Sequence, residues 1–453
     1  MRISKISELA DRERLLKAMI HRFRFNLHEL SDDIDVFMAF ETMNNRGKSL
    51  SRLELLKNRL IYLSTLAKEP EPEKTRVRAN INAVWRTVYE ELGRNHEQSL
   101  DDDDFLRAHW IVFFGYDKDQ ADPLTQFLLN AYFTIENLEA GKLPLKEIQA
   151  YVDSLQGCVR VWQRMYFPEN HSQNLGPKTY AGLVRLKRLG FGVLRPLLLS
   201  MLAGEPADDE IAKPLHEAER FLLLVRSFAR TRSHVGEAES YRLAAELHHG
   251  TKTLGDCSAI LSDRVRRHFT QGEFQTTIDG LFADEDQLGF FGLPGLHFVL
   301  FEFEENLRRV AKSAESKIVW NDFAGSRKTI EHVYPQSAED DTWPNFRGFN
   351  ASEKHRLLHS LGNLTAVSAA KNSSLSRSSF DKKKKGTDKI PGFSQGSFSE
   401  LRIAQNADWT PKEILEGGIK LLEFIENQWS VTLGDRAKKI GLLKLGFVEG
   451  LSA

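Results

Sequence analysis

Apolar residues recur at helical spacing over most of this 453-residue chain. The pattern begins at Leu9 and continues to about Leu66, with a polar interruption over 44–49 that is typical of a loop between two helices. Ser49 or Ser51 suits the N-cap of the second helix. The N-terminal part of the chain is therefore predicted to be helical.

The same spacing continues from about Lys74 to Arg309, without β-type alternation or a repeat of fixed period. The segments that carry it are 77–92, 104–114, 124–138, 145–165, 180–202 and 211–231. We therefore expect a helical scaffold in the middle of the chain.

The pattern changes near Ser316. Short β-branched and aromatic runs at 317–320 and 329–334 predict strands, and 361–367 predicts a turn followed by a third short strand. Residues 368–372 predict the start of a helix, and the chain closes with a predicted amphipathic helix over 409–429. The expected fold class is mainly α, a multi-helical scaffold with a small αβ module embedded in it.

Composition narrows the class of protein. Lys and Arg total 62 against 63 Asp and Glu, a net charge of -1, so any anionic partner must meet a local patch. Two cysteines are too few for a disulfide framework or a thiolate zinc site. The sequence shows no apolar leader segment and no membrane-spanning stretch, which predicts a cytoplasmic protein without membrane contact.

The residues at 331–337 and two later asparagines carry the candidate chemistry. A neutral His332 imidazole can take a proton from water at pH 7. Glu331 and Asn372 offer the oxygen ligands that Mg²⁺ (or Mn²⁺) prefers. Together these residue types suit metal-assisted phosphodiester hydrolysis. The alternatives are a surface ion pair at 331–332 and a turn or cap role for each of Asn363 and Asn372.

Strand geometry raises an objection, because consecutive side chains point to opposite faces, so Glu331 and His332 could not share one phosphate. Pro335 reduces this difficulty, because it forces the strand to end or bulge close by. Gly362 permits a tight turn that aims the Asn363 amide at nearby backbone and fixes the loop.

Two polar segments can each be interpreted either as ordinary surface structure or as a binding site. Lys382, Lys383, Lys384 and Lys385, with Arg377, form either a solvated face or a clamp for the DNA backbone. Asn44, Arg46 and Gly47 form either a polar interhelical loop or a phosphate cradle. Three acids, Glu302, Glu304 and Glu305, are expected to face solvent from a helix.

The motif at 330–337 with Asn363 and Asn372 resembles the ββα-metal, or HNH, nuclease motif. More specifically, Trp343, 359–364, Phe380 and the following lysines make residues 316–429 similar to the C-terminal nuclease domain of GmrSD-type (type IV, modification-dependent) restriction endonucleases. The resemblance implies that His332 is the general base, that Glu331 and Asn372 bind the metal, and that Asn363 shapes the loop. It also implies that His359 orients a phosphate or ligand.

Residues 40–50 and 54–58 resemble the end of the GmrSD nucleotide-sensing domain. That family's upstream Asp-Gly-Gln-Gln-Arg motif has no counterpart before Asn44, so an NTP site is incomplete in this chain. A partner chain supplies the missing half, or the chain is a shortened version of a longer one. The last helix also departs from the family, with 416–418 reading Glu-Gly-Gly where an Arg is usual.

Together these features predict a divalent-metal-dependent endonuclease that acts on double-stranded DNA, in restriction of foreign or modified phage DNA. The alternative is a catalytically idle DNA-binding or scaffold subunit of a defence complex. The expected division of the chain is a partial nucleotide-sensing segment (1–68), a helical middle domain (69–310), the HNH module (311–390) and a C-terminal helical segment (391–453).

Overall fold

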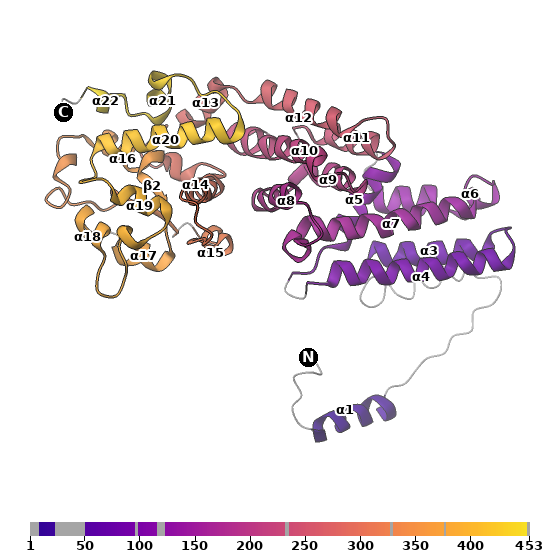
Figure 1. Cartoon of the computed structure of the whole chain (residues 1–453). Helices are drawn as coiled ribbons and strands as arrows, with labels where there is room; N and C mark the ends of the chain where they lie inside the picture. The colour runs from indigo at the N-terminus through magenta and orange to yellow at the C-terminus, as the bar shows by residue number, and fades with distance from the viewer. Residues whose placement is uncertain are drawn as a thin grey trace. The chain divides into compact units, whose positions relative to one another are not determined.

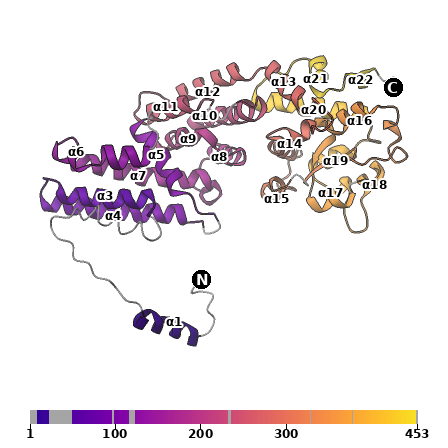
Figure 2. The same cartoon turned by 180° about the vertical axis from the view of Figure 1, so that it is seen from behind.

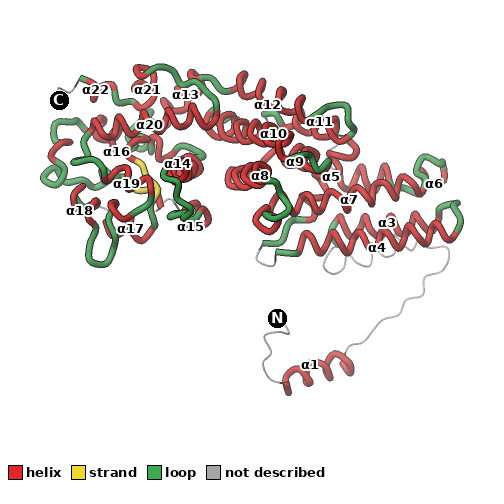
Figure 3. The backbone as a smooth tube through the Cα atoms, in the orientation of Figure 1, coloured by secondary structure: helices red, strands yellow, loops and turns green. Residues whose placement is uncertain are grey.

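The computed structural model describes residues 9–22, 50–95, 98–115, 123–231, 235–326, 329–375 and 377–450 (Figure 1). These residues are mainly helical, and the strands among them form one small two-stranded sheet (Figure 3). The mainly α fold class is therefore confirmed. Within the described ranges, no helix has the length and apolar character needed to cross a membrane.

The chain divides into two compact units, and each is described by itself. Unit 1 comprises residues 1–83 and 124–149, and unit 2 comprises 84–123 and 150–453. This grouping follows spatial compactness, so it does not coincide with the four consecutive segments expected from the sequence, which remain a prediction.

The described elements of unit 1 are all helices. Its elements are α1 (Leu9–Arg22), α3 (Arg52–Leu66), the first part of α4 (Glu71–Gly93), the π-helix η2 (Pro123–Tyr132), α6 (Ile135–Glu139) and the start of α7 (Leu145–Tyr166). Ser51 caps α3 in a capping box with Glu54, which confirms one of the two predicted caps. Leu56, Leu60 and other α3 residues spaced by helical turns are fully buried.

Unit 2 begins with a scaffold of helices that contains the rest of α4 and α7. The further elements of this scaffold are α5 (Asp102–Phe114), η3 (Pro168–His171), α8 (Pro177–Leu189), η4 (Gly192–Leu194), α9 (Arg195–Ala203), α10 (Asp208–Arg220), η5 (Phe221–Phe228), α11 (Glu237–His248), α12 (Leu254–His268), α13 (Gln271–Leu281), η6 (Gly289–Gly292) and α14 (Leu296–Val310).

Two predicted long helices are each divided in the structure. The helix expected over 180–202 is interrupted after Leu189, where Gly190 has a positive φ of 78° and Pro196 starts the next helix. The helix expected over 211–231 continues from α10 into the π-helix η5. At Gly190, the local backbone conformation therefore interrupts a helix that the continuous apolar pattern predicts.

The small sheet lies in the last third of unit 2. The elements there are α15 (Trp320–Ala324), β1 (Ile330–His332), η8 (Pro344–Phe346), α16 (Ala351–Leu358), η9 (Leu361–Asn363), β2 (Leu364–Ala366), α17 (Ala369–Leu375), α18 (Phe380–Lys385), η10 (Phe393–Gln395), α19 (Phe398–Ala404), α20 (Pro411–Trp429), α21 (Arg436–Leu443) and α22 (Gly446–Glu449). Helix α17 packs against β1, while α14 and α19 pack against β2. Helices α17, α18 and α19 lie next to one another in both views (Figure 1 and Figure 2).

The strand predicted at 317–320 is wrong. Val319 is exposed and Trp320 begins the short helix α15, where its ring packs edge-on against Phe301 at 5.2 Å between centroids. The residues at 317–320 therefore do not form a paired strand, and Trp320 instead anchors α15 to α14. The predicted strand near 364 and the terminal helix, capped by Thr410 with Pro411 in its first turn, are both confirmed.

Two of the three acids expected to face solvent are buried. Glu302 is ion-paired with Arg188 at 2.7 Å, and burial raises its pKa. Glu304 accepts hydrogen bonds from the backbone N–H groups of Phe398 and Ser399, and so caps the start of α19. The acids hold α14 to its neighbours, and the expectation of a solvated acidic face is wrong for both.

Candidate functional site

The antiparallel pair β1 and β2 forms the frame of the candidate site. Glu331 lies opposite Thr365 and His332 lies opposite Leu364. All six strand residues are buried. The turn before β2 carries Asn363 and α17 follows β2, so the sheet gathers the predicted site residues within one part of unit 2.

His332 and His359 form a buried pair. The His332 Nε2 atom lies 3.3 Å from His359 Nδ1, and the two rings meet edge to face. A hydrogen bond between two ring nitrogens requires that one of them carries no proton. The geometry therefore favours a pair that holds at least one neutral imidazole.

The surroundings strengthen this preference for the neutral form. Burial, together with the nearby His359 and the Lys383 ammonium, lowers the pKa of His332 to about 3. Burial and His355 lower the pKa of His359 to about 4. At pH 7 both rings are therefore neutral, and a neutral imidazole is the form that can accept a proton.

Phe291 of η6 covers the histidine pair. Its ring centroid lies 4.7 Å from that of His332 and 6.4 Å from that of His359. Phe291 also lines a cavity of about 520 Å³, together with Arg188, His297 and Trp320. Phe291 therefore contacts the histidine pair and also forms part of the wall of this cavity.

Glu331 and His332 contact different partners, as alternation along a strand requires. The Glu331 carboxylate is buried and ion-paired with the Lys383 ammonium. Lys383 Nζ also donates to the His332 carbonyl oxygen at 3.0 Å. Burial raises the pKa of Glu331, while the Lys383 charge opposes that shift. One buried cation therefore contacts both residues of the predicted motif.

Asn363 is held by four hydrogen bonds of its side-chain amide. Its Oδ1 atom accepts from the Tyr334 N–H at 2.7 Å and from Trp409 Nε1 at 3.1 Å. Its Nδ2 atom donates to the carbonyls of Tyr334 and Leu358, both at 2.9 Å. The amide thereby joins the end of β1 to the turn before β2, which is a positioning task.

Gly362 brings this turn against α20. A Cβ atom built on Gly362 would lie 1.9 Å from the Ile414 carbonyl oxygen and 2.4 Å from the Gly418 nitrogen. The glycines at 417 and 418, where the family usually has an Arg, therefore border a contact between two backbones. Helix α20, from the segment expected to follow the HNH module, is therefore packed directly on the loop that carries Asn363.

Asn372 is placed beside β1 by α17. Its Nδ2 atom donates to the Ile330 carbonyl oxygen at 3.0 Å. Glu331 and Asn372 thus carry oxygen-bearing side chains next to the same strand, and oxygen is the ligand that a hard cation prefers. The Glu331 carboxylate is already paired with the Lys383 ammonium. Among the described residues, however, no group of three or more His, Cys, Asp or Glu side chains could hold a metal ion.

The lysine run does not act as one surface. Lys383 is fully buried, and Lys384 Nζ donates to the Asn406 carbonyl at 2.9 Å. Lys382 and Arg377 are exposed, and Lys385 pairs with Asp381 on the exposed side of α18. A contact with DNA backbone therefore remains a prediction for the exposed cations, whereas Lys383 in this structure faces the core.

The other predicted loop, Asn44, Arg46 and Gly47, lies outside the described residues. Its assignment as a nucleotide or phosphate cradle remains a prediction from the sequence.

Sequence reasoning assigned Lys383 to DNA contact and missed its ion pair with Glu331. It also missed Trp409 and the buried ion pair of Lys371 with Glu400, whose atoms lie 2.7 Å apart. Spacing offered one signal, because Lys383 follows the apolar Phe380 by three residues and so shares its buried helix face. Trp409 and Glu400 are distant in sequence and gave no such local signal.

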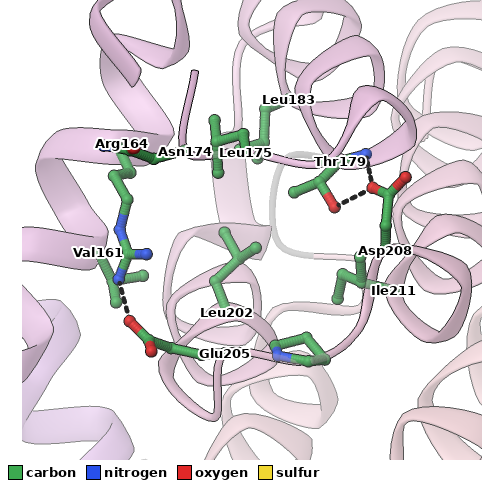
Figure 4. Close-up of a pocket in the computed structure, with 12 residues that line it drawn as sticks. Val161, Arg164, Asn174, Leu175, Thr179, Leu183, Leu202, Glu205, Asp208 and Ile211 are labelled. Atoms are coloured by element: carbon green, nitrogen blue, oxygen red, sulfur yellow. Dashed lines mark hydrogen bonds and ion pairs between the residues drawn. The ribbon is translucent and has the colours of Figure 1, made fainter. Parts of the chain in front are cut away.

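A second cavity, of about 330 Å³, lies in the helical scaffold (Figure 4). Arg164 and Glu205 form an ion pair at 3.1 Å across one end of it, and Asp208 accepts a hydrogen bond from the Thr179 hydroxyl at 2.7 Å at the other. The charged side chains of the cavity wall are therefore paired with other residues of the same wall. Neither histidine of the His332–His359 pair lines this cavity.

Comparison with known proteins gives one match. Residues 294–424 match the family model for GmrSD restriction endonucleases, C-terminal domain. The matched segment contains both strands, the histidine pair and Lys383. It confirms the resemblance drawn from the sequence for this part of the chain. A comparison with curated proteins found no match.

Proposed function

From the GmrSD restriction endonuclease C-terminal domain that residues 294–424 carry, we propose that the protein is a divalent-metal-dependent DNA endonuclease of the HNH type. Its substrate is double-stranded DNA, and its role is the restriction of foreign or modified phage DNA. The single observation that supports this best is the buried, neutral His332 beside His359 within the matched domain.

In this proposal His332 acts as the general base. A neutral imidazole accepts a proton from a water molecule, whose oxygen attacks the phosphorus atom of the scissile bond. The bond from phosphorus to the leaving oxygen breaks, and that oxygen then takes up a proton. His359, which contacts His332, orients the base or a phosphate oxygen. Asn363 acts through the loop that it holds rather than on the substrate.

Glu331 and Asn372 would hold Mg²⁺ or Mn²⁺ beside β1. When bound, such an ion stabilises the negative charge that develops on the phosphate. Lys382, Lys385 and Arg377 would contact the DNA backbone, where exposed cations add affinity without sequence specificity. We further propose that a partner chain supplies the nucleotide-sensing half and that the protein acts in the cytoplasm.

A catalytically idle DNA-binding or scaffold subunit is the second candidate. Two observations favour it: Phe291 covers His332, and Lys383 is paired with the Glu331 carboxylate. A site closed in this way does no chemistry until both contacts change.

Cleavage assays distinguish the two candidates. Unmodified plasmid and modified phage DNA are incubated with the purified protein in Mg²⁺, Mn²⁺ or EDTA. We expect metal-dependent cutting that His332→Ala abolishes while DNA binding is retained. His297→Ala is the matched control, because His297 lies in the same domain and its Nε2 atom bonds to the Ser326 carbonyl away from the pair. Cutting that survives His332→Ala would refute the catalytic assignment, and no cutting by folded protein would favour the idle subunit.

A further inference from the structure

We infer that the cavity of about 520 Å³ beside the histidine pair receives one unstacked base of bound DNA. The inference rests on the proposed function, in which DNA is the substrate. It adds a place, separate from the candidate base His332, where a single base of that substrate is held and recognised. No covalent step is involved.

The wall of the cavity suits a flat, uncharged ring. Trp320, Phe291 and Phe298 line it, and glycine and aliphatic residues make up much of the remainder. Among the described residues that line the cavity, none is Asp, Glu or Lys. Bases stack on aromatic side chains whatever the sequence, because every base has a π-face. The wall therefore favours a base over a phosphate group.

Arg188 supplies hydrogen-bond donors to this wall without adding net charge. Its Nη1 atom is ion-paired with Glu302 at 2.7 Å, and among the described residues this is its only hydrogen-bonded partner. A guanidinium carries five N–H groups, so donors remain for the acceptor edge of a base. The guanidinium also lies 5.7 Å from the centre of the Trp320 ring. His297 lines the cavity too, but its Nε2 atom is bonded to the Ser326 carbonyl oxygen.

The size of the cavity sets how DNA can enter it. Its volume lies in the range of pockets that hold small molecules, and one nucleoside is a ligand of that kind. A double helix is far too wide for such a space. DNA can therefore occupy the cavity only through a base that has turned out of the stack, as in enzymes that act on bases.

The cavity and the histidine pair share one loop. Phe291 lines the cavity and its ring centroid lies 4.7 Å from that of His332. The preceding residue, Phe290, donates its backbone N–H to the His359 carbonyl oxygen at 3.0 Å. A base is joined to its phosphate through one sugar ring, which is a span similar to one phenyl ring. A base in the cavity would therefore place its own backbone next to the pair.

The first test cross-links bound bases to the protein. Full-length protein in EDTA, which prevents metal-dependent cutting, is mixed with duplexes that contain 5-iodouracil, either paired or mismatched. Long-wavelength ultraviolet light joins this base to an aromatic ring on which it stacks, and tandem mass spectrometry identifies the residue. We expect cross-links at Trp320 or Phe291, at least about fivefold more from the mismatched duplex, because a mismatch lowers the cost of unpairing.

Two outcomes of this test would overturn the inference. One is that neither duplex forms a cross-link in the cavity. The other comes from a parallel sample with free 5-iodo-2′-deoxyuridine. Cross-links at Trp320 from the free nucleoside but from neither duplex would identify a small-molecule site instead.

The second test compares Trp320→Leu with Phe349→Leu. Both residues are part-exposed aromatics of the matched segment, but Phe349 does not line the cavity and contacts Phe447 instead. Fluorescence anisotropy in EDTA measures the affinity for mismatched and paired duplexes. The parent and Phe349→Leu should prefer the mismatched duplex by at least about fivefold, and Trp320→Leu should lose this preference with its stacking surface. Equal preferences in all three proteins contradict the inference.

Trp320 also anchors α15, so a further variant keeps it in place. Ala324→Phe adds a ring at a residue that lines the cavity. It should lower cross-linking at least about fivefold, since a filled cavity has no room for a base. Ala351→Phe is the control, because Ala351 is exposed at the start of α16. Equal cross-linking of the two variants would contradict the inference.

The failures of the two hypotheses can be told apart, because binding and cross-linking are measured without metal. DNA cutting by the unmodified protein without cross-links in the cavity refutes the inference alone. Cross-links in the cavity without any cutting refute the proposed function alone.

Discussion

Asn363 uses both lone pairs and both protons of its side-chain amide, and all four partners are protein groups. An asparagine that makes so many buried contacts specifies one loop conformation. Its neighbours are the ends of the two strands that carry or border His332. The geometry of the candidate base therefore depends on a residue that does not need to touch DNA.

Asn363→Asp should destabilise the protein by about 2–4 kcal/mol. The aspartate keeps the acceptor oxygen but places a second oxygen against the carbonyls of Tyr334 and Leu358, where the amide donates. Urea unfolding followed by near-ultraviolet circular dichroism measures the change. Asn321→Asp is the control, because Asn321 is exposed in the first turn of α15, and it should stay within about 0.5 kcal/mol of the parent.

His109 predicts how stability depends on pH. It is fully buried in the helical scaffold, its Nε2 atom lies 3.0 Å from the Ser154 hydroxyl, and burial lowers its pKa to about 3. In the unfolded chain the pKa returns to about 6.5. The unfolded state then binds more protons below that pH, so folding stability falls as the pH decreases.

His109 should account for a loss of about 1.4 kcal/mol per pH unit between about pH 6 and pH 3. His109→Gln keeps a polar group near Ser154 but removes the titrating imidazole. The free energy of unfolding of this variant should therefore fall less steeply as the pH decreases. Denaturant titrations at several pH values measure the slopes. His268→Gln, at the exposed end of α12, should keep the parent slope. Equal slopes for all three proteins would show that His109 is not the responsible group.

Helix α20 and the 362–363 turn form a contact between backbones, which is unusual for two separate elements. Side chains normally keep backbones apart, and only glycine permits this approach. The contact positions Asn363 from outside the strand pair, and Trp409, just before α20, reinforces it. The position of a helix far along the chain therefore fixes the loop of the candidate site.

Gly362→Ala should destabilise the protein by more than about 2 kcal/mol, because the added methyl overlaps the Ile414 carbonyl oxygen and the helix must move away. Gly348→Ala is the matched control, since a Cβ atom there meets nothing within 4 Å. Thermal melting of both variants gives the comparison. A Gly362→Ala protein as stable as Gly348→Ala would mean that the contact is looser than the structure has it.

Prediction from sequence succeeded where one local pattern decides the structure. Strand β1, the Ser51 cap and the helical scaffold follow from periodicity and capping chemistry. It failed at 317–320, because β-branched and aromatic residues suit a strand locally while Trp320 packs as a helix anchor. The ion pair of Lys383 with Glu331 joins residues that are distant in the chain, and only the fold reveals it.

At the scale of the whole molecule, the candidate site lies within unit 2 and is assembled from separate segments of it. Phe291, the strand pair, the lysine of α18 and Trp409 come from four parts of the chain. The boundary expected after residue 390 cuts through this assembly, because Glu400 and Trp409 lie beyond it. The family match also extends past that point, to residue 424.

A chain that ends after residue 390 should therefore lose cooperative folding of the domain. It lacks Trp409, the partner of Asn363, and all of α20. A chain that ends after residue 445 keeps both and removes only α22, so it is the control. Soluble yield and the melting curve measure the outcome. A cooperative transition in the shorter chain, equal to that of the control, would show that the domain ends before α19.

The burial of Lys383 also changes how a mutational scan of 382–385 should be interpreted. The four consecutive lysines lie in different environments: the Lys382 side chain is exposed to solvent, whereas the Lys383 side chain is buried in the core. Replacing all four at once would combine an altered salt dependence of DNA affinity with damage to the domain interior. Single-position scans separate the two effects, and only substitution of the exposed lysines reports on polyanion binding.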